Sequence, residues 1–257
     1  MTNKDCMNVK PSYSIYISCI NIGKYFQPGS PKSLKNEIIL VTGGGNGIVD
    51  VSDRKQVSHA AEQIRKQIGH VTILFNNAGY GGDINYGWKQ DPQLIEKTFD
   101  VNVLSHFWTI QEFLPHMIDI GRGHVVGTCS ILGFLYASGG SAYAGSKFAM
   151  RGTLHSIKEE LRRLPKKNDV QISMVYPSLI STDMIASIDV RPKRWFFLGG
   201  MTSPRAAAKQ IVRGVLHNKQ HIYIPESVRI FQFLIGIMPD EVYAKLSDLM
   251  GSPGMDN

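Results

Sequence analysis

A tyrosine and a lysine four residues apart are the most informative pair in this sequence. Tyr143 and Lys147 lie in the run Ser-Ala-Tyr-Ala-Gly-Ser-Lys at 141–147. On a helix, this spacing places both side chains on one face, about one turn apart. A phenol has an ordinary pKa near ~10 and is a poor proton-transfer group at neutral pH. A neighbouring ammonium stabilises the phenolate, which suits proton exchange with an alcohol oxygen.

The composition is that of a globular protein with a basic balance. Hydrophobic residues make up 43% and charged residues 19% of the 257 residues, enough for one sizeable α/β domain and unlike a disordered chain. The 28 basic and 21 acidic residues give a net charge of +7, which favours an anionic partner such as a dinucleotide or an acidic lipid surface. The sequence contains no zinc-finger spacing and no basic helix with interleaved aromatics, so we expect no nucleic-acid partner.

The cysteines and histidines predict neither a disulfide framework nor a metal site. Cys6, Cys19 and Cys129 are too few and too scattered for either, and we expect reduced thiols, with Cys129 in the core. The 8 histidines are dispersed and form no HExxH motif, so structural or surface positions are expected for them.

Apolar runs alternate with helical patterns along the chain. Strands are predicted at 38–42, 71–75, 124–128, 170–176 and 221–224. Helices are predicted at 53–68, 91–120, 142–164, 204–217 and near the C-terminus. This alternation predicts an α/β fold with a doubly wound parallel sheet, in which ligands bind beyond the carboxyl ends of the strands. The glycine cluster at 43–47, the Asn-Asn-Ala-Gly turn at 76–79, Ser130 and Pro177 all follow predicted strands.

In combination these features resemble the short-chain dehydrogenase/reductase family. The pattern Thr42-Gly43-x-x-x-Gly47-Ile48, the turn at 76–79, Ser130 and Tyr143-x-x-x-Lys147 stand in the order and spacing of that family. The run at 91–109 is similar to a branch that holds the membrane-associated retinol dehydrogenases and the 17-beta-hydroxysteroid dehydrogenase type 11 and 13 proteins. The resemblance implies a single Rossmann-like domain at 35–257, after an N-terminal segment and linker at 1–34.

The resemblance assigns roles to four side chains. Tyr143 would exchange a proton with the substrate oxygen, and Ser130 would hydrogen-bond that oxygen. Lys147 would stabilise the Tyr143 phenolate and bind the nicotinamide ribose, and Asn102 would hold a water that links Lys147 to solvent. The implied reaction is hydride transfer with NAD or NADP between an alcohol and a ketone or aldehyde, on a lipophilic substrate of steroid or retinoid type. The implied cofactor-binding residues are Gly43, Gly47, Ile48, Asp50, Val51, Asn76, Ala78, Gly79, Tyr143, Lys147, Pro177 and Thr182.

The chain departs from the family pattern after Ile48. Val49 stands where another glycine is expected, and the Asp50-Val51 turn that follows belongs, in the family, at the end of the third strand. The helix, strand, helix and strand between these points are absent, on the order of 40 residues. Since the family sheet has the order 3-2-1-4-5-6-7, we predict a reduced sheet of order 1-4-5-6-7 with its first strand at an edge.

This loss weakens the expected cofactor site. A pyrophosphate normally rests on the N-terminus of the helix after the glycine loop. The helix available here begins beside Asp50 and Asp53, whose charges oppose a phosphate. We therefore expect weak cofactor binding. The alternative function is a catalytically impaired variant or incomplete gene product with a membrane-binding or dimerisation role.

Five segments bear on partners and location. Residues 13–26 are too short and polar to span a membrane, but suit an interface or a strand. The run at 191–197 suits a membrane interface or a substrate lid, and 228–238 suits core packing or membrane docking. The predicted helices at 91–120 and 142–164 resemble those of the family's dimer interface and favour a homodimer. The resemblance implies the cytoplasmic face of the endoplasmic reticulum membrane or a lipid-droplet surface, with the cytoplasm as alternative.

Overall fold

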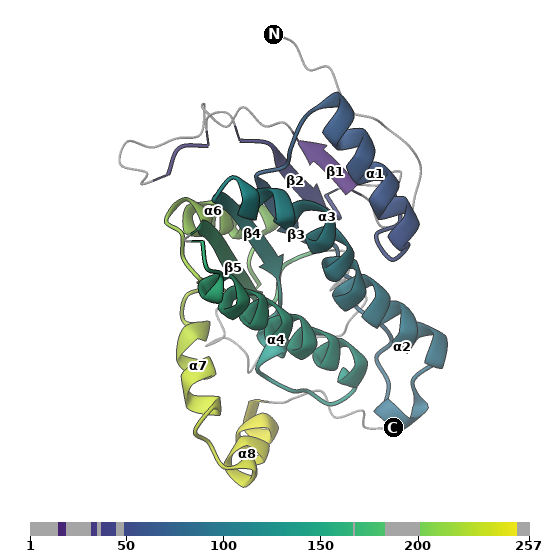
Figure 1. The fold of residues 1–257 in the computed structure, drawn as a ribbon. Helices are drawn as coiled ribbons and strands as arrows, with labels where there is room; N and C mark the ends of the chain where they lie inside the picture. Colours follow the sequence, from purple (N-terminus) through teal and green to yellow (C-terminus); the bar gives the residue numbers. More distant parts are fainter. Residues whose placement is uncertain are drawn as a thin grey trace.

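Six strands form one sheet in the order β1-β2-β3-β4-β5-β6 (Figure 1). They are β1 Ile15–Ser18, β2 Ile39–Thr42, β3 Ile73–Asn76, β4 Arg122–Thr128, β5 Asp169–Pro177 and β6 His221–Ile224. The computed structural model describes residues 15–18, 32–34, 37–44, 49–166, 168–182 and 201–250. Three of the segments discussed above therefore lie outside the described residues: Gly47 and Ile48, the basic-aromatic run at 191–197, and most of 13–26.

The strands β2 to β6 are parallel throughout. Their order matches the reduced sheet predicted from the sequence, in which β2 lies beside β3. The two strands that the family pattern places on the other side of β2 are absent from the described sheet. The helix α1, Arg54–Gln67, connects β2 to β3. The prediction of a Rossmann-like parallel sheet that lacks two edge strands is confirmed.

The edge of β2 is not left open. The strand β1 pairs antiparallel with it, in a register that joins Ile15 to Thr42 and Ser18 to Ile39. An uncovered edge would present unpaired backbone groups to other chains. Of the two interpretations of the segment at 13–26, the one as a strand is thus correct for Ile15–Ser18.

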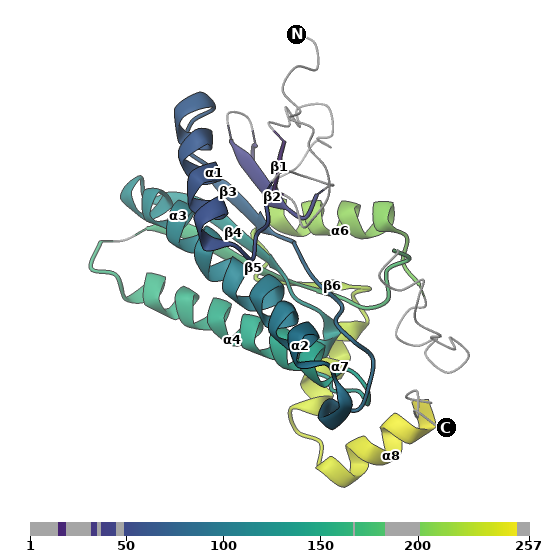
Figure 2. The same cartoon turned by 90° about the vertical axis from the view of Figure 1, so that its right-hand side faces the viewer.

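Helices cover both faces of the sheet (Figure 2). The described helices are α1, α2 Pro92–Phe99, α3 Ser105–Asp119, α4 Ser141–Arg163, α6 Pro204–Leu216, α7 Val228–Ile235 and α8 Asp240–Met250. One face carries α1, α3 and α4, and α6 lies on the opposite face, while α7 and α8 extend beyond the sheet (Figures 1 and 2). A π-helical turn at Asp100–Leu104 separates α2 from α3, so the helix predicted at 91–120 is one helical run with an irregular turn in its middle.

The apolar runs predicted as strands are buried because both faces are covered. Leu40, Leu74 and Val125 are fully buried in the main core, beneath α1, α3 and α4. A second cluster places Ala207 and Val215 of α6 against the other face. Cys129 belongs to the main core, as predicted, and burial raises the pKa of its thiol.

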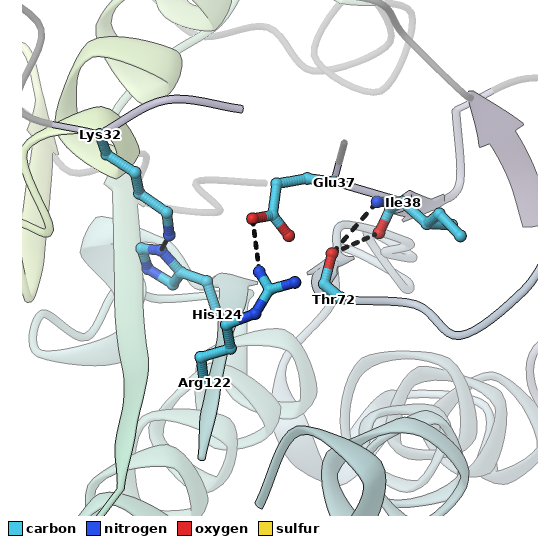
Figure 3. A network of polar contacts seen from close by, with 6 residues as sticks. All are labelled: Lys32, Glu37, Ile38, Thr72, Arg122 and His124. Carbon is cyan, nitrogen blue, oxygen red and sulfur yellow. Dashed lines mark hydrogen bonds and ion pairs between the residues drawn. The ribbon is translucent and has the colours of Figure 1, made fainter. Parts of the chain in front are cut away.

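Polar side chains tie the start of the domain to the amino ends of the strands (Figure 3). Lys32 Nζ donates a hydrogen bond to His124 Nδ1 at 3.1 Å. His124 Nε2 lies 2.7 Å from Ser173 Oγ, which itself donates to the carbonyl oxygen of Lys219 at 2.7 Å. Since the Ser173 proton goes to that carbonyl, Nε2 of His124 carries the imidazole proton and Nδ1 is free to accept from Lys32.

Two more contacts support the same edge (Figure 3). Glu37 Oε1 and Arg122 Nη1 form an ion pair at 2.7 Å, and the backbone amide of Ile38 donates to Thr72 Oγ1 at 3.1 Å. The ion pair joins Glu37, just before β2, to the first residue of β4, and the hydrogen bond joins Ile38 to the residue before β3. They fix the register of β2, whose carboxyl end carries the glycine cluster.

Helix α7 and the turn after it carry both buried and exposed apolar side chains. Val228 is buried, whereas Ile230, Phe233 and Ile237 are 62%, 70% and 68% exposed. Core packing, one of the two interpretations for 228–238, therefore describes only part of this segment. Within the described ranges, no helix combines the length and apolar character that crossing a bilayer requires.

Candidate active site

The turn after β3 is held against the end of β2 by a threonine. Thr42 Oγ1 accepts hydrogen bonds from the backbone amides of Asn77 and Ala78, at 2.9 and 3.0 Å. The Asn77 side chain donates to the Thr42 carbonyl oxygen at 3.2 Å and accepts from Thr128 Oγ1 at 3.2 Å. These bonds join the carboxyl ends of β2, β3 and β4, the edge at which ligands bind in such sheets.

Gly43 begins the glycine cluster in a left-handed conformation, with φ of +69°. A Cβ atom at this position would lie 2.7 Å from Cα of Ala78. Only glycine therefore allows β2 to end so close to the turn after β3.

Replacing Gly43 with alanine is expected to lower the free energy of unfolding by about 2–4 kcal/mol, through backbone strain and the clash with Ala78. Gly121→Ala is the matched control, because Gly121 has φ of +71° but open space around a Cβ. We expect the control to cost only about 1–2 kcal/mol, from strain alone. Urea denaturation of both variants measures the difference, and equal losses would contradict the close contact at Gly43.

Asn102 lies in the π-helical turn, and its side chain is fully buried. Its Nδ2 group donates to the Tyr80 carbonyl oxygen at 2.9 Å and to Ser146 Oγ at 3.0 Å, and its Oδ1 accepts from the Tyr80 amide at 2.7 Å. Asn102 thus ties the chain just after the Asn-Asn-Ala-Gly turn to helix α4. Its expected role in holding a water remains a prediction.

Lys147 is 3% exposed, and its amine points toward the carboxyl end of β4. Its Nζ donates to the Thr128 carbonyl oxygen at 3.1 Å and lies 5.5 Å from the centre of the Tyr143 ring. It also lies 3.7 Å from where a Cβ on Gly79 would be, so the turn after β3 passes directly beside the amine. The expected pairing of Tyr143 and Lys147 on one helix face is confirmed.

Ser130 follows β4 and is 7% exposed. It caps the short 3-10 helix at Ile131–Gly133, where its Oγ accepts from the Leu132 amide at 3.2 Å. Among the described residues no acceptor takes the Ser130 hydroxyl proton, so the hydroxyl can still donate to a ligand. Tyr143, in the first turn of α4, is half-buried.

The Asp50-Val51 turn also reaches this edge. Val51 is fully buried in a small cluster with Ala78 and Val101. Asp50 Oδ1 accepts from the amide and hydroxyl of Ser52, at 2.9 and 2.7 Å. The turn is therefore packed beside the Asn-Asn-Ala-Gly turn, and it leads straight into α1.

Three other expected cofactor residues, Asn76, Pro177 and Thr182, have surroundings that differ from one another. Asn76 is 1% exposed, and its Oδ1 accepts from Thr109 Oγ1 at 2.8 Å, so its amide lies beneath α3. Pro177 ends β5 at the carboxyl edge. Thr182 is exposed, and its hydroxyl contacts the Ile180 carbonyl oxygen at 3.4 Å. Their contribution to cofactor binding remains a prediction.

The sequence analysis did not predict the roles of the residues that assemble the site. Thr42, Asn77, Thr128 and Tyr80 supply the hydrogen bonds that join the strand ends and orient Lys147 and Asn102. A signal was present for two of them, because a threonine that ends a buried apolar strand has a hydroxyl that needs a partner.

The sequence profile of the family described as "short chain dehydrogenase" matches residues 48–192, more than half of the chain. The chain belongs to this family. Estradiol 17-beta-dehydrogenase 11 of Mus musculus is 31% identical over 269 residues, covering 88% of each protein. Retinol dehydrogenase 10 of Rattus norvegicus is 32% identical over 203 residues, which cover 79% of this chain and 59% of that protein.

Solved structures of the family share the fold. A short-chain dehydrogenase/reductase from Burkholderia phymatum, in complex with NAD, has a TM-score of 0.63 at 21% identity and covers 77% of this chain and 76% of its own. A short-chain dehydrogenase from Burkholderia cenocepacia, in complex with NADP, has a TM-score of 0.64 at 20% identity with the same coverage.

The relatives also support the loss of an internal segment. The match to the mouse protein extends over 269 residues, although it covers 88% of a chain of 257, so on the order of 40 positions of that alignment have no residue here. The family profile begins its match at residue 48, where the sequence departs from the family pattern. Both observations agree with the two strands that the sheet lacks.

Proposed function

We propose that this chain is an NAD(P)-dependent oxidoreductase that interconverts an alcohol and a ketone or aldehyde on a lipophilic substrate of steroid or retinoid type. One observation carries the proposal. The buried amine of Lys147 lies beside the ring of Tyr143, at the strand end where Ser130 keeps a hydroxyl proton to donate.

The three side chains have complementary chemistry. A bound nicotinamide cofactor would supply the hydride acceptor or donor. Ser130 donates a hydrogen bond to the substrate oxygen and stabilises charge that develops on it. The Tyr143 hydroxyl exchanges a proton with the same oxygen, and the Lys147 cation lies beside its ring. Asn102 fixes the neighbouring turn and α4 relative to each other, so the reacting groups keep their positions.

The relatives and the surface support a lipophilic substrate. The named relatives are an estradiol dehydrogenase and a retinol dehydrogenase. In this chain Trp88, Met201 and Phe233 are large apolar side chains exposed to 80%, 59% and 70%. Exposed apolar side chains of this kind suit an apolar ligand or the membrane or lipid-droplet surface that holds it.

A substrate panel with a lysine variant tests this function. Purified protein is incubated with steroid, retinoid and short-chain alcohols and either NAD or NADP, and absorbance of the reduced cofactor gives the rate. We expect turnover of the lipophilic alcohols that falls at least about tenfold in Lys147→Met, because the cation beside Tyr143 is lost. Lys158→Met, exposed on the same helix, is the control and is expected to retain full activity. Equal rates in all three proteins would refute the proposal.

A second candidate is a non-catalytic family member that keeps a membrane-binding or dimerising surface. The acidic start of α1 and the exposed apolar residues of α7 favour it. It predicts that the same panel shows no turnover that depends on Lys147, with either cofactor.

A further inference from the structure

The chain between β3 and α2 borders the proposed active site at two places. At the first, Gly79 lies beside the Lys147 amine, which is 3.7 Å from the position that a Cβ on this glycine would take. At the second, Gly87 lies against the first residue of α4, because a Cβ on Gly87 would be 2.8 Å from Ser141 Oγ. Ser141 stands two residues before Tyr143. The segment therefore runs from the Lys147 amine to the turn of α4 that carries the tyrosine.

Hydrogen bonds hold the far end of this segment against the loop before α4. The backbone amide of Asn85 donates to the Gly139 carbonyl oxygen at 3.2 Å. The side chain of Gln90 is buried, donates from Nε2 to the Asp83 carbonyl oxygen at 2.8 Å, and accepts from Ser141 Oγ at 3.0 Å. Because backbone groups and a buried amide make these contacts, the segment keeps a fixed position relative to α4.

Two stacked aromatic rings stand on this fixed segment. Tyr86 immediately precedes the short 3-10 helix Gly87–Lys89, which contains Trp88. The two rings are nearly parallel, with centres 4.9 Å apart and planes at 6°. Lys89 Nζ lies 5.7 Å from the centre of the Tyr86 ring. Trp88 is 80% exposed, so most of the indole is open to solvent although one neighbour supports it.

An indole held in this way suits a flat apolar ligand. Single exposed apolar side chains are common on soluble proteins and need no explanation. Trp88 differs because its ring is supported by Tyr86 and its backbone is fixed beside the first turn of α4. A tryptophan offers roughly 150–250 Å² of surface to a partner. Since the ring is already in place, little conformational freedom is lost when a ligand covers it.

The charges around Trp88 favour a substrate over a membrane surface as the occupant. Asp83 and Asp91 carry negative charges on either side of Lys89 in the sequence, whereas acidic lipid headgroups attract clusters of basic residues. A lipophilic alcohol that places its hydroxyl at the reacting groups has to leave its apolar body outside them. Trp88 stands at the edge of that region, next in the chain to the glycine that contacts Ser141.

We propose that Trp88 is a specificity-determining residue, whose indole face, backed by Tyr86, binds the flat apolar body of the substrate, a fused-ring or polyene alcohol. The hydroxyl of that alcohol lies at Tyr143 and Ser130. The inference rests on the proposed function, because it takes the edge with Tyr143 and Lys147 as the place of reaction. It adds that the protein selects large lipophilic alcohols over short ones by a contact remote from the reacting groups.

Calorimetric titration tests the contact. The full chain with excess NADH or NADPH is titrated with a steroid alcohol and with retinol, because a reduced cofactor cannot accept hydride from an alcohol. We expect Trp88→Ala to raise Kd at least about tenfold, as for a tryptophan anchor, and Trp88→Phe to stay within about threefold of wild type. Phe233→Ala, at a residue 70% exposed on α7, is the matched control and should leave Kd unchanged. An unchanged Kd in Trp88→Ala, or an equal increase in Phe233→Ala, would overturn the proposal.

Steady-state kinetics separates this contact from the reacting groups. We expect Trp88→Ala to raise KM for the steroid alcohol and retinol at least about tenfold, with kcat within about twofold of wild type. For a short-chain alcohol, kcat/KM should be unchanged, because that alcohol is too small to reach the ring from the tyrosine. A loss of the same size for short-chain and lipophilic alcohols would refute a role in specificity.

Binding and turnover distinguish this inference from the proposed function. Binding of the lipophilic alcohols that depends on Trp88, without turnover that depends on Lys147, would refute only the proposed reaction. Turnover that depends on Lys147, with binding indifferent to Trp88, would refute only the inference.

Discussion

Replacing Tyr143 with phenylalanine is expected to lower kcat/KM for the alcohol substrate by about 100-fold or more. General acid–base catalysis contributes about 100- to 10,000-fold, and the substitution removes the one hydroxyl group of the ring that lies beside the Lys147 amine. The phenylalanine ring keeps the shape of the side chain and its packing above Lys147. Nucleotide binding should therefore change little, and the loss should lie in kcat.

Tyr176→Phe is the matched control for this change. Tyr176 also loses only a hydroxyl, which contacts Met174 Sδ at 3.4 Å inside β5, away from the proposed reaction. Initial rates with saturating cofactor compare the three proteins. A Tyr143→Phe protein that retains more than about a tenth of the wild-type kcat/KM would show that another group transfers the proton.

The fold is expected to lose about 4 kcal/mol of stability when the pH falls from 7.5 to 5, because of two buried histidines. Burial, helped by the positive charge of Lys147, lowers the pKa of His106 to about 3. Burial and Lys32 do the same for His124, to about 3. The unfolded chain binds a proton at each ring below its ordinary pKa of 6.5, whereas the folded chain does not. Stability is thus full above pH 6.5 and is lost progressively toward pH 3, at about 2 kcal/mol per histidine by pH 5.

Urea denaturation at several pH values measures this loss. His106→Gln and His124→Gln each remove one titrating ring, so each variant should lose the part of the pH dependence that this ring contributes, about 2 kcal/mol between pH 7.5 and 5. The slope is informative even where a substitution lowers stability at every pH. Unchanged slopes in both variants would show that the two rings are protonated in the folded protein.

Helix α1 and the parallel strands could be predicted from the sequence because their signals are local. Val57, Ala61 and Ile64 form an apolar stripe that is buried as predicted, although Ile68, assigned to the same stripe, lies past the helix end and is 38% exposed. The strand order followed from the place where the sequence departs from the family pattern. Removing an edge leaves the remaining strands adjacent, so the reduced order was the simplest outcome.

The supporting hydrogen bonds could not be predicted in the same way, because they join residues distant in sequence. The Asn76 side chain lies against Thr109 of α3, whereas Asn77 joins Thr42 and Thr128, and the assignment of Asn76 to the cofactor remains a prediction. The π-helical turn around Asn102 is also invisible in the hydrophobic pattern, since it shifts the helix by a single residue. Both features depend on contacts between residues that are distant in the sequence.

The antiparallel strand β1 has a consequence for synthesis of the chain. It precedes β2 in the sequence, and antiparallel partners need no crossover helix between them, whereas β2 and β3 can meet only once α1 has been made. A nascent chain can therefore cover its first parallel strand on one side before the second exists, during the period when exposed backbone most readily joins another nascent chain. Residues 15–18 would then act as a folding aid built into the protein itself.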